Sequence, residues 1–456
     1  MSESKRKLFG TDGIRGKANV HPMTAELALS LGQAAAYAFR AGGRGRPRIV
    51  IGKDTRLSGY MFEDALASGI SSMGVDVIQV GPIPTPGLAF LTLDMRCDAG
   101  VMITASHNPY QDNGIKFFGR DGFKLGDEIE AKIEALVGSE HLIEGRASAD
   151  DLGQAQRIDD ASGRYVVFLK NTFPRQHSLD DMKIVLDCAH GAAYKVAPTV
   201  LRELGAELDC MGIAPNGRNI NDGVGSLFPE RTAERVREVG ADVGVALDGD
   251  ADRVILVDET GRILDGDELI GICARAMADR KILRGGGVVA TVMSNLGLEK
   301  WLGSLGLDLV RAPVGDRYVV EAMRSGGYNL GGEQSGHLIF SDVATTGDGM
   351  IAALQVLGQM KATGLKLSEL TTGFERFPQV LINVEVDEKK PLESLPSLQK
   401  ALTEVEEKLG DQGRVLVRYS GTEPSARVMI EGEDEVQVSA LAEWLAEELR
   451  RAVANS

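Results

Sequence analysis

The most constraining feature of this sequence is a unit of apolar strand, polar loop, helix-like stretch and second short apolar strand, which occurs three times. The first strands of the units cover residues 48–52, 183–187 and 287–291, and the second strands cover 75–80, 206–210 and 307–310. Strand, helix and strand at similar intervals are typical of parallel α/β units. Three occurrences predict three related α/β domains rather than one large sheet, and the long polar stretches 138–160 and 258–267 favour their separation.

The chain from residue 377 onward follows a different pattern. Alternating and helical spacing of apolar residues predicts strand, helix, strand, strand and helix over residues 377–386, 392–409, 415–418, 427–431 and 438–453. We therefore expect an α/β fold of three related α/β domains with mixed sheets plus a smaller C-terminal α+β domain, with a hinge at residues 371–374. The predicted domains are residues 1–155, 156–257, 258–372 and 373–456.

Charge and composition exclude several classes of function. The chain has 50 Lys and Arg against 66 Asp and Glu, a net charge of −16, which disfavours nucleic acid and anionic membranes as partners. No apolar run approaches the ~18 residues of a membrane span, and the N-terminus has no apolar signal segment, so we expect a cytoplasmic protein. The four cysteines form no CxxC pair, and we expect buried free thiols.

The strongest chemical motif is DGDADR at residues 248–253, between two apolar stretches. Asp248, Asp250 and Asp252 alternate, and alternate side chains of an extended loop can point the same way. Three close carboxylates repel one another unless a cation lies among them, and oxygen ligands suit Mg²⁺ or Ca²⁺. An EF-hand requires Gly at its sixth position, where this loop has Arg253, and flanking helices rather than strands. The alternative is a solvated polar turn.

A second motif, TASHNP at residues 104–109, follows an apolar strand. A hydrolase interpretation of Ser106 is weak, because the G-x-S-x-G elbow is absent and the adjacent His107 is rarely placed as a base. The rival hypothesis is a serine that carries a phosphoryl group, which needs a metal and basic groups nearby. A simple loop serine is the third alternative.

Three glycine-rich loops complete the set. Residues 418–424, RYSGTEP, followed by Arg427, could cradle a phosphate through backbone amides, hydroxyls and guanidinium groups, although a plain turn between strands is an equal alternative. Residues 331–337, GGEQSGH, could bind sugar hydroxyls. Residues 8–16, LFGTDGIRG, are either a flexible lead-in or an anion contact.

Together and in this order, these motifs resemble the α-D-phosphohexomutase superfamily over essentially the whole chain. The superfamily's phosphoserine, metal, sugar and phosphate loops are similar to residues 104–109, 248–253, 332–337 and 420–424. The chain resembles the glucosamine branch of the superfamily at residues 8–16, 291–299 and 314–319. It also resembles that branch at Gln334, where phosphomannomutase/phosphoglucomutase relatives usually have Met. Two residues depart from that branch: Ala251, where it commonly has Gly, and Tyr419, where it typically has Pro.

The resemblance implies four domains around one central cleft and an isomerase that interconverts glucosamine 6-phosphate and glucosamine 1-phosphate. A phosphoserine enzyme and glucosamine 1,6-bisphosphate would be intermediates, and the product would supply UDP-N-acetylglucosamine and peptidoglycan precursors. The expected partners are small sugar phosphates, and the resemblance is compatible with a homodimer. The alternatives are a phosphomannomutase/phosphoglucomutase, a metal-dependent phosphatase or a non-catalytic sugar-phosphate binding protein.

The resemblance also implies a role for each site residue. Ser106 would carry the phosphoryl group and join Asp248, Asp250 and Asp252 around one Mg²⁺ per chain. Lys116 and His337 are both candidate general bases. The remaining groups would support the transferring phosphoryl (Arg15, His107, Arg253), bind the sugar hydroxyls (Glu333, Ser335) or bind the substrate's phosphate (Arg418, Ser420, Gly421, Thr422, Arg427).

Overall fold

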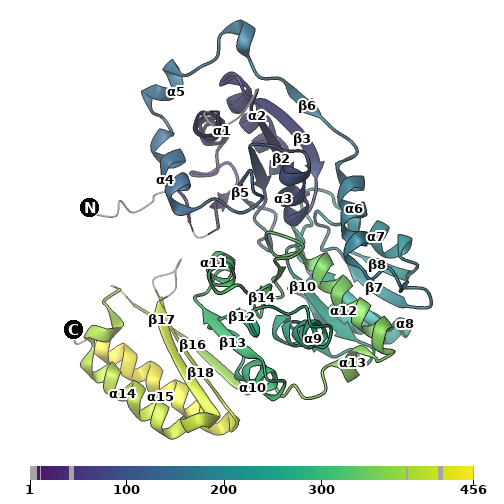
Figure 1. The fold of residues 1–456 in the computed structure, drawn as a ribbon. Helices are drawn as coiled ribbons and strands as arrows, with labels where there is room; N and C mark the ends of the chain where they lie inside the picture. Colours follow the sequence, from purple (N-terminus) through teal and green to yellow (C-terminus); the bar gives the residue numbers. More distant parts are fainter. Residues whose placement is uncertain (1–7, 11, 41–45, 387–388, 420–424, 455–456) are drawn as a thin grey trace. The chain divides into compact units, whose positions relative to one another are not determined.

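The computed structural model describes residues 8–10, 12–40, 46–386, 389–419 and 425–454. The chain forms two compact units: a large unit of Met1–Val292 with Val310–Thr372, and a small unit of Met293–Leu309 with Gly373–Ser456. Three mixed sheets, built mainly by the large unit, and one antiparallel sheet in the small unit confirm the predicted fold class (Figure 1).

The first sheet has the strand order β1-β5-β4-β2-β3-β6. Its strands are β1 (Ile14–Lys17), β2 (Arg48–Lys53), β3 (Asp76–Pro82), β4 (Ala99–Ile103), β5 (Asp112–Gly119) and β6 (Ala155–Arg157). It is mixed because β2 pairs parallel with β3 and β4, whereas β5 pairs antiparallel with β4 and β1. The helices of this part are α1 (Ala25–Phe39), α2 (Ser58–Ser72), α3 (Thr85–Asp94), α4 (Asp127–Leu136) and α5 (Glu140–Glu144), with a 3-10 turn at Ala149–Asp151.

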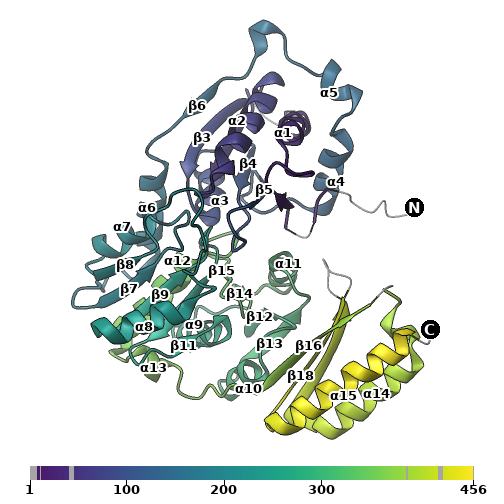
Figure 2. The same cartoon turned by 180° about the vertical axis from the view of Figure 1, so that it is seen from behind.

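Side chains that alternate in direction along β2 contact helices on both faces of this sheet. Ile49 and Ile51 join the core formed with α1 and α2, which lie side by side in both ribbon views (Figures 1 and 2). A Cβ added to Gly52 would point to the opposite face of the sheet, 3.1 Å from the side chain of Leu88 on α3. The result is a layered α/β domain whose β2 and β4 end at one edge.

The second sheet has the order β11-β10-β9-β7-β8 and the third has the order β13-β12-β14-β15. The second sheet comprises β7 (Lys183–Asp187), β8 (Glu207–Met211), β9 (Val243–Leu247), β10 (Val254–Asp258) and β11 (Ile263–Leu264), with α6 (Ala161–Thr172), α7 (Val196–Glu203) and α8 (Pro229–Val239). The third comprises β12 (Gly287–Thr291), β13 (Asp308–Ala312), β14 (Leu330–Gly332) and β15 (Leu338–Phe340), with α9 (Gly266–Asp279), α11 (Asp316–Gly326), α12 (Gly349–Thr363) and α13 (Leu367–Leu370). The domain limits remain predictions, and we note that β6 and β11 carry the first two sheets past residues 155 and 257.

The small unit has the predicted order of strand, helix, strand, strand and helix. Its elements are β16 (Gln379–Glu385), α14 (Pro396–Leu409), β17 (Gly413–Tyr419), β18 (Ser425–Gly432) and α15 (Glu435–Ala454), with 3-10 turns at Leu392–Ser394 and Gly410–Gln412. Both helices contribute to one core on the sheet. The helix α10 (Leu296–Ser304), which the sequence places in the third α/β unit, packs with this unit instead. The predicted hinge at 371–374 contains one boundary between the units, and the boundaries after Val292 and Leu309 were not predicted.

Asn295 attaches α10 to the small unit. Its side chain accepts hydrogen bonds from the backbone amides of Gly297 (2.9 Å) and Phe377 (2.9 Å). Its amide donates to the Phe377 carbonyl (2.9 Å) and to the Glu431 carboxylate (3.2 Å). The residue is fully buried, so each of these partners would lose its bond in a place that water does not reach.

Replacing Asn295 by alanine is therefore expected to destabilise the small unit by about 2–4 kcal/mol. Both tryptophans of the chain, Trp301 and Trp444, belong to this unit, so urea unfolding followed by tryptophan fluorescence reports on it directly. Lys300→Ala is the matched control, because the ion pair between Lys300 and Glu433 is exposed and its loss should cost less than ~1 kcal/mol. Equal midpoints for the two variants would contradict this prediction.

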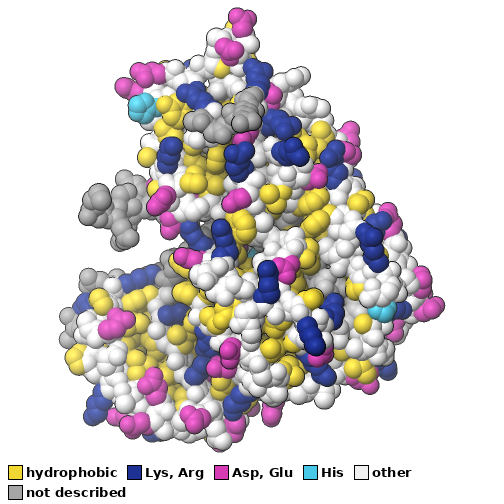
Figure 3. Space-filling model, in the orientation of Figure 1, with side chains coloured by type: hydrophobic (Ala, Val, Ile, Leu, Met, Phe, Trp, Pro, Cys, Tyr) yellow, Lys and Arg dark blue, Asp and Glu magenta, His cyan; other side chains and the backbone are white. Residues whose placement is uncertain are grey.

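Two further expectations concern cysteines and membranes. All four cysteines are free, as expected. Cys97, Cys188 and Cys273 are buried as expected, whereas Cys210 is partly exposed. In the described part of the chain no helix has the length and apolar character needed to span a bilayer. Side chains of both charge signs are mixed over the face of the large unit that Figure 3 shows.

Candidate active site

Three loops that the sequence singled out meet in the large unit, each at the end of a buried strand. Ser106 follows β4, the three aspartates lie between β9 and β10, and Glu333 to His337 form the turn between β14 and β15. Close backbone packing holds the loops together. A Cβ at Gly249 would lie 2.6 Å from the Ser106 carbonyl oxygen, and one at Gly336 would lie 2.1 Å from the Val254 carbonyl oxygen. Only glycine permits these approaches.

Ser106 is almost fully buried, with 2% of its surface exposed. Its backbone has a φ of 50°, in the left-handed region that side-chain-bearing residues seldom adopt. In this conformation the hydroxyl donates to Asp248 Oδ2 at 2.6 Å and lies 3.3 Å from His107 Nδ1. The serine hydroxyl is thus aimed into the carboxylate cluster rather than at solvent.

Asp248, Asp250 and Asp252 each offer a carboxylate oxygen within 4.8 Å of the others, and all three residues are buried. Thr85 donates to Asp250 Oδ2 at 2.6 Å, but Asp250 Oδ1 and Asp252 Oδ1 have no hydrogen-bond partner within the described residues. Burial and the two neighbouring carboxylates raise the pKa of Asp248 well above its ordinary value. Orphaned buried oxygens and mutual repulsion both fit a hard divalent cation at this position.

Ala251, in the same loop, also has a left-handed φ, of 58°. This backbone angle explains the glycine that the glucosamine branch commonly has there, because glycine adopts it without a Cβ penalty. The three carboxylates keep their arrangement around this residue.

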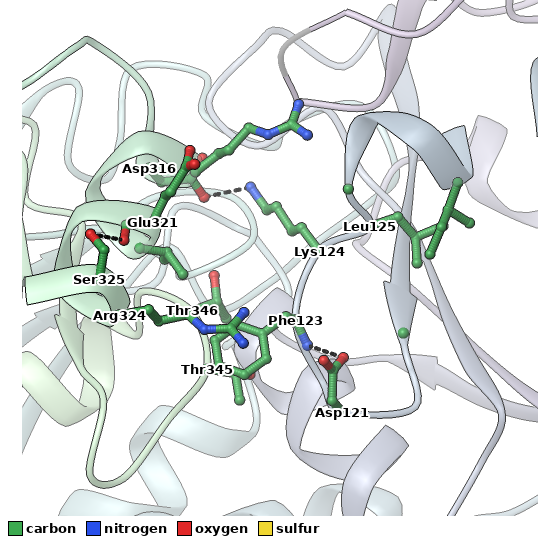
Figure 4. Close-up of a pocket in the computed structure, with 15 residues that line it drawn as sticks. Asp121, Phe123, Lys124, Leu125, Asp316, Glu321, Arg324, Ser325, Thr345 and Thr346 are labelled. Carbon is green, nitrogen blue, oxygen red and sulfur yellow. Dashed lines mark hydrogen bonds and ion pairs between the residues drawn. The ribbon is translucent and has the colours of Figure 1, made fainter. Parts of the chain in front are cut away.

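A chain of alternating charges connects the two candidate bases. Lys116 Nζ lies 3.4 Å from Asp250 Oδ2 and 3.1 Å from Asp12 Oδ2. Lys124 pairs with the other oxygen of Asp12 and donates to Asp316 Oδ2 at 2.6 Å (Figure 4).

The chain closes through the second base. His337 Nε2 is 3.6 Å from the same Asp316 oxygen, and His337 Nδ1 is 3.6 Å from Asp252 Oδ2. Lys116 and His337 are therefore linked on one side by the aspartate cluster and on the other by Asp12, Lys124 and Asp316.

Burial and neighbouring charges shift the pKa values of these groups. Burial opposes the charge of Lys116, but Asp12 and Asp250 outweigh it and raise the pKa of this lysine. Burial likewise opposes the charge of His337, and Asp252, Asp316 and Glu333 raise its pKa nonetheless. The surrounding carboxylates thus favour the protonated form of both groups, and either one has to lose its proton before it can act as a base.

His107 behaves differently. Burial, together with the charges of Arg253 and Arg15, lowers the pKa of His107 to about 4. Its imidazole is therefore neutral near pH 7 when Ser106 is unmodified.

Two arginines face the same region with unused donors. Arg15 Nε and Arg253 Nε are buried and find no hydrogen-bond acceptor among the residues described. Arg15 lies on β1, next to the strand that carries Lys116, and its ion pair with Asp12 leaves this nitrogen unused. Buried guanidinium donors of this kind suit an anionic ligand.

The sugar-loop residues are also oriented by their neighbours. Glu333 Oε1 accepts the Gly315 amide at 3.2 Å, and Ser335 Oγ donates to Glu333 Oε2 at 3.3 Å.

A cavity of about 730 Å³ lies beside this region, between the segment after β5 and the helix α11. Lys124 and Asp316 form part of its wall, and the Arg324 guanidinium lies 4.7 Å from the centre of the Phe123 ring (Figure 4).

In the small unit, Arg418 on β17 and Arg427 on β18 are direct cross-strand partners. Burial and the charge of Arg427 lower the pKa of Arg418, and Arg418 Nε is buried with no hydrogen-bond partner in the described part of the chain. Two adjacent guanidinium groups repel each other unless an anion lies between them, which fits a phosphate. The predicted phosphate ligands Ser420, Gly421 and Thr422 lie outside the described residues.

Sequence reasoning missed several residues of this site. Asp12 and Asp316 lie within stretches that it had singled out, residues 8–16 and 314–319, but they were given no role. Thr85 and Lys124 carried no motif signal. Thr85 is the first residue of α3, which begins directly after the loop that follows β3, so its position at a strand-to-helix connection was the available clue.

Four family models cover this chain: phosphoglucomutase/phosphomannomutase alpha/beta/alpha domain I at residues 6–143, domain II at 163–261, domain III at 265–377 and the C-terminal domain at 381–448. The chain therefore belongs to the phosphoglucomutase/phosphomannomutase family, a class of sugar-phosphate mutases.

Curated relatives place it more narrowly, beside the phosphoglucosamine mutases. It is 58% identical to the phosphoglucosamine mutase of Pelobacter propionicus, with 98% of both chains covered. It is 60% identical to that of Geobacter metallireducens, with 97% of this chain and 98% of the relative covered.

Solved structures share the fold. A phosphoglucomutase/phosphomannomutase family protein of Burkholderia thailandensis matches with a TM-score of 0.80 at 24% identity, covering 98% of this chain and 97% of that one. An N-acetylphosphoglucosamine mutase of Aspergillus fumigatus, solved with GlcNAc-6P and magnesium, matches with a TM-score of 0.68 at 20% identity, covering 99% and 97%.

Proposed function

We propose that this protein interconverts glucosamine 6-phosphate and glucosamine 1-phosphate, with Ser106 as the phosphoryl carrier. One observation carries the proposal: the buried Ser106 hydroxyl contacts Asp248 in a three-carboxylate cluster that is within reach of Lys116 and His337. A binding protein needs neither a buried hydroxyl nor a cation site beside it. The full-length relatives that carry the name phosphoglucosamine mutase support the choice of substrate.

Mg²⁺ held by Asp248, Asp250 and Asp252 would neutralise charge on the phosphoryl oxygens of phosphorylated Ser106. The chain's own residues would do the rest. The 1-hydroxyl of glucosamine 6-phosphate attacks phosphorus, the bond from phosphorus to Ser106 Oγ breaks, and Oγ recovers a proton. Lys116 or His337, in its deprotonated form, would take the proton of the attacking hydroxyl. The product of this step is glucosamine 1,6-bisphosphate.

The second half-reaction reverses the first at the other end of the sugar. After the bisphosphate turns over, Ser106 Oγ attacks the 6-phosphate, the bond from phosphorus to O6 breaks, and glucosamine 1-phosphate leaves. Arg15 and Arg253 have unused buried donors for the phosphoryl oxygens. Glu333 and Ser335 are suited to sugar hydroxyls in either orientation. Arg418 and Arg427 would hold the phosphate that does not react.

We propose a cytoplasmic enzyme that feeds UDP-N-acetylglucosamine synthesis, with sugar phosphates as its ligands. A homodimer and the lack of nucleic-acid and membrane partners are proposals of the same kind.

A substrate panel tests the proposed specificity. With Mg²⁺ present, glucosamine 6-phosphate, glucose 1-phosphate and mannose 1-phosphate are compared by phosphorus NMR, which observes both isomers without coupling enzymes. We expect kcat/KM for the amino sugar to exceed the others by roughly tenfold or more, the ratio that about 1.4 kcal/mol of differential transition-state binding provides. A higher kcat/KM for glucose 1-phosphate would indicate a phosphoglucomutase, and net release of inorganic phosphate would indicate a phosphatase.

A further inference from the structure

We propose that Arg56 is a positioning residue that fixes the backbone of the Ser106 loop for phosphoryl transfer, an inference that rests on the proposed function. Arg56 follows β2, the strand next to β4 in the first sheet, and touches neither the aspartate cluster nor the candidate bases through any contact described here. It is the largest of the fully buried side chains, with no exposed surface.

All five N–H donors of this guanidinium have acceptors. Nε donates to Asp54 Oδ2 at 2.8 Å. The two terminal nitrogens donate to four backbone carbonyls of the Ser106 loop: Ser106 (2.9 Å), Asn108 (2.8 Å), Pro109 and Asp112 (3.1 Å). A single planar group thus spans the loop from its nucleophile to the start of β5.

Asp54 connects the same arginine to the amide side of Ser106. Its Oδ2, which accepts from Arg56, also accepts the Thr104 hydroxyl at 2.8 Å. Because that hydroxyl proton is committed to Asp54, Thr104 Oγ1 is left as an acceptor, and it receives the Ser106 amide at 2.9 Å. Arg56 and Asp54 therefore hold both the carbonyl and the amide of the residue that carries the reactive hydroxyl.

Asn221, from the second domain, reinforces this arrangement. Its side-chain amide donates to the carbonyls of Ser106 (2.8 Å) and Asn108 (3.1 Å), the same two that accept from Arg56 Nη2. Ser106 needs this support because a left-handed φ is unfavourable for a residue with a side chain. Burying the charge of Arg56 costs desolvation free energy. In this loop the buried arginine stabilises a strained backbone that directs Ser106 Oγ toward Asp248.

The test compares Arg56→Lys with Lys53→Met. Lysine keeps the charge of Arg56 but has three donors on one point, so it cannot serve four carbonyls and a carboxylate. Lys53 is also fully buried and lies three residues away, but the side-chain interactions described for it are with Glu63 and Tyr60, outside the Ser106 loop. Both variants should lower the melting temperature, which makes Lys53→Met a control for a general loss of stability.

Only Arg56→Lys is expected to change the chemistry. Its kcat should fall about 100-fold, the effect of misplacing a reacting group by about 1 Å, while KM stays within about threefold of the wild-type value. Phosphorylation of Ser106 by added glucosamine 1,6-bisphosphate, followed by intact mass over time, should slow by a similar factor. If Arg56→Lys does not fold, Asn221→Gly removes two other hydrogen bonds to the same carbonyls, those of Ser106 and Asn108, at a φ of 59° that glycine accepts, and kcat should fall about tenfold.

The outcomes separate the two proposals. A wild-type protein that neither turns over sugar phosphates nor becomes phosphorylated at Ser106 would contradict the proposed function. A wild type that does both, with Arg56→Lys and Asn221→Gly loading phosphate as fast as Lys53→Met, would contradict the positioning role of Arg56 alone.

Discussion

Ser106→Ala is expected to reduce turnover by a factor on the order of 10⁴ or more and to abolish the phosphorylated form of the protein. Under the proposed function this hydroxyl, which lies 2.6 Å from Asp248, accepts and returns the phosphoryl group. Alanine removes only the oxygen and leaves the loop's backbone contacts unchanged, so the protein should stay folded. Initial rates with glucosamine 6-phosphate and intact mass of the purified protein measure the two effects.

Ser335→Ala is the matched control for this variant. It makes the same change of side chain on the sugar loop, where Ser335 donates to Glu333. We expect a weaker effect on turnover and a normal phosphorylated mass. If Ser106→Ala still showed a phosphorylated species, or kept turnover close to that of Ser335→Ala, another residue would have to be the phosphoryl carrier.

Strong apolar periodicity predicted most of the fold. The run of β-branched and aliphatic residues at 48–52 becomes β2, and the equivalent runs become β7 and β12, because each is buried on both faces of a sheet. The strand β6, at Ala155–Arg157, was missed because its three residues are exposed and two of them are polar. Its place is set by backbone pairing with β3, which side-chain pattern does not encode.

The attachment of α10 to the small unit was missed for a related reason. Helical spacing predicts that the segment 296–304 is a helix, but not which core it joins. That choice depends on the side-chain hydrogen bonds of Asn295 and on the contact between Trp301 and Phe374, whose rings lie 5.8 Å apart. Both involve residues about 80 positions away in the sequence, beyond the reach of local patterns.

The candidate site divides in the same way. The three aspartates could be named in advance from their local spacing, and Ser106 could be named from the resemblance of residues 104–109 to the superfamily's phosphoserine loop. Lys124 and Arg56 could not, because their roles come from distances to segments far along the chain. The position of Arg56 at the carboxyl end of a parallel strand was a clue, since such ends gather at the functional edge of an α/β sheet.

Removal of divalent metal is expected to be the second large effect. EDTA should reduce turnover roughly 10³-fold, since a cation that neutralises phosphoryl charge contributes several kcal/mol to the transition state. Added Mg²⁺ should restore the rate and raise the melting temperature, because Asp248, Asp250 and Asp252 would hold it in the folded protein and not in the unfolded chain.

Asp248→Asn separates metal binding from folding, because its effects on activity and on stability should have opposite signs. Asparagine keeps the shape of the side chain and an acceptor for the Arg253 amide (3.2 Å), but it removes one of three mutually repelling charges. In EDTA this variant should therefore melt about 2 °C or more above the wild type, although its turnover with Mg²⁺ is severely reduced.

Asp187→Asn serves as the control for Asp248→Asn. Asp187 is an equally buried aspartate of the same domain, and its oxygens accept the amides of Ala189 (2.9 Å) and Gly225 (2.7 Å). Loss of its charge should lower the melting temperature and leave the stabilisation by Mg²⁺ intact, because Asp187 lies outside the cluster. If Asp248→Asn were instead less stable than the wild type in EDTA and still gained as much from Mg²⁺, the three aspartates would be a structural network rather than the ligands of a catalytic cation.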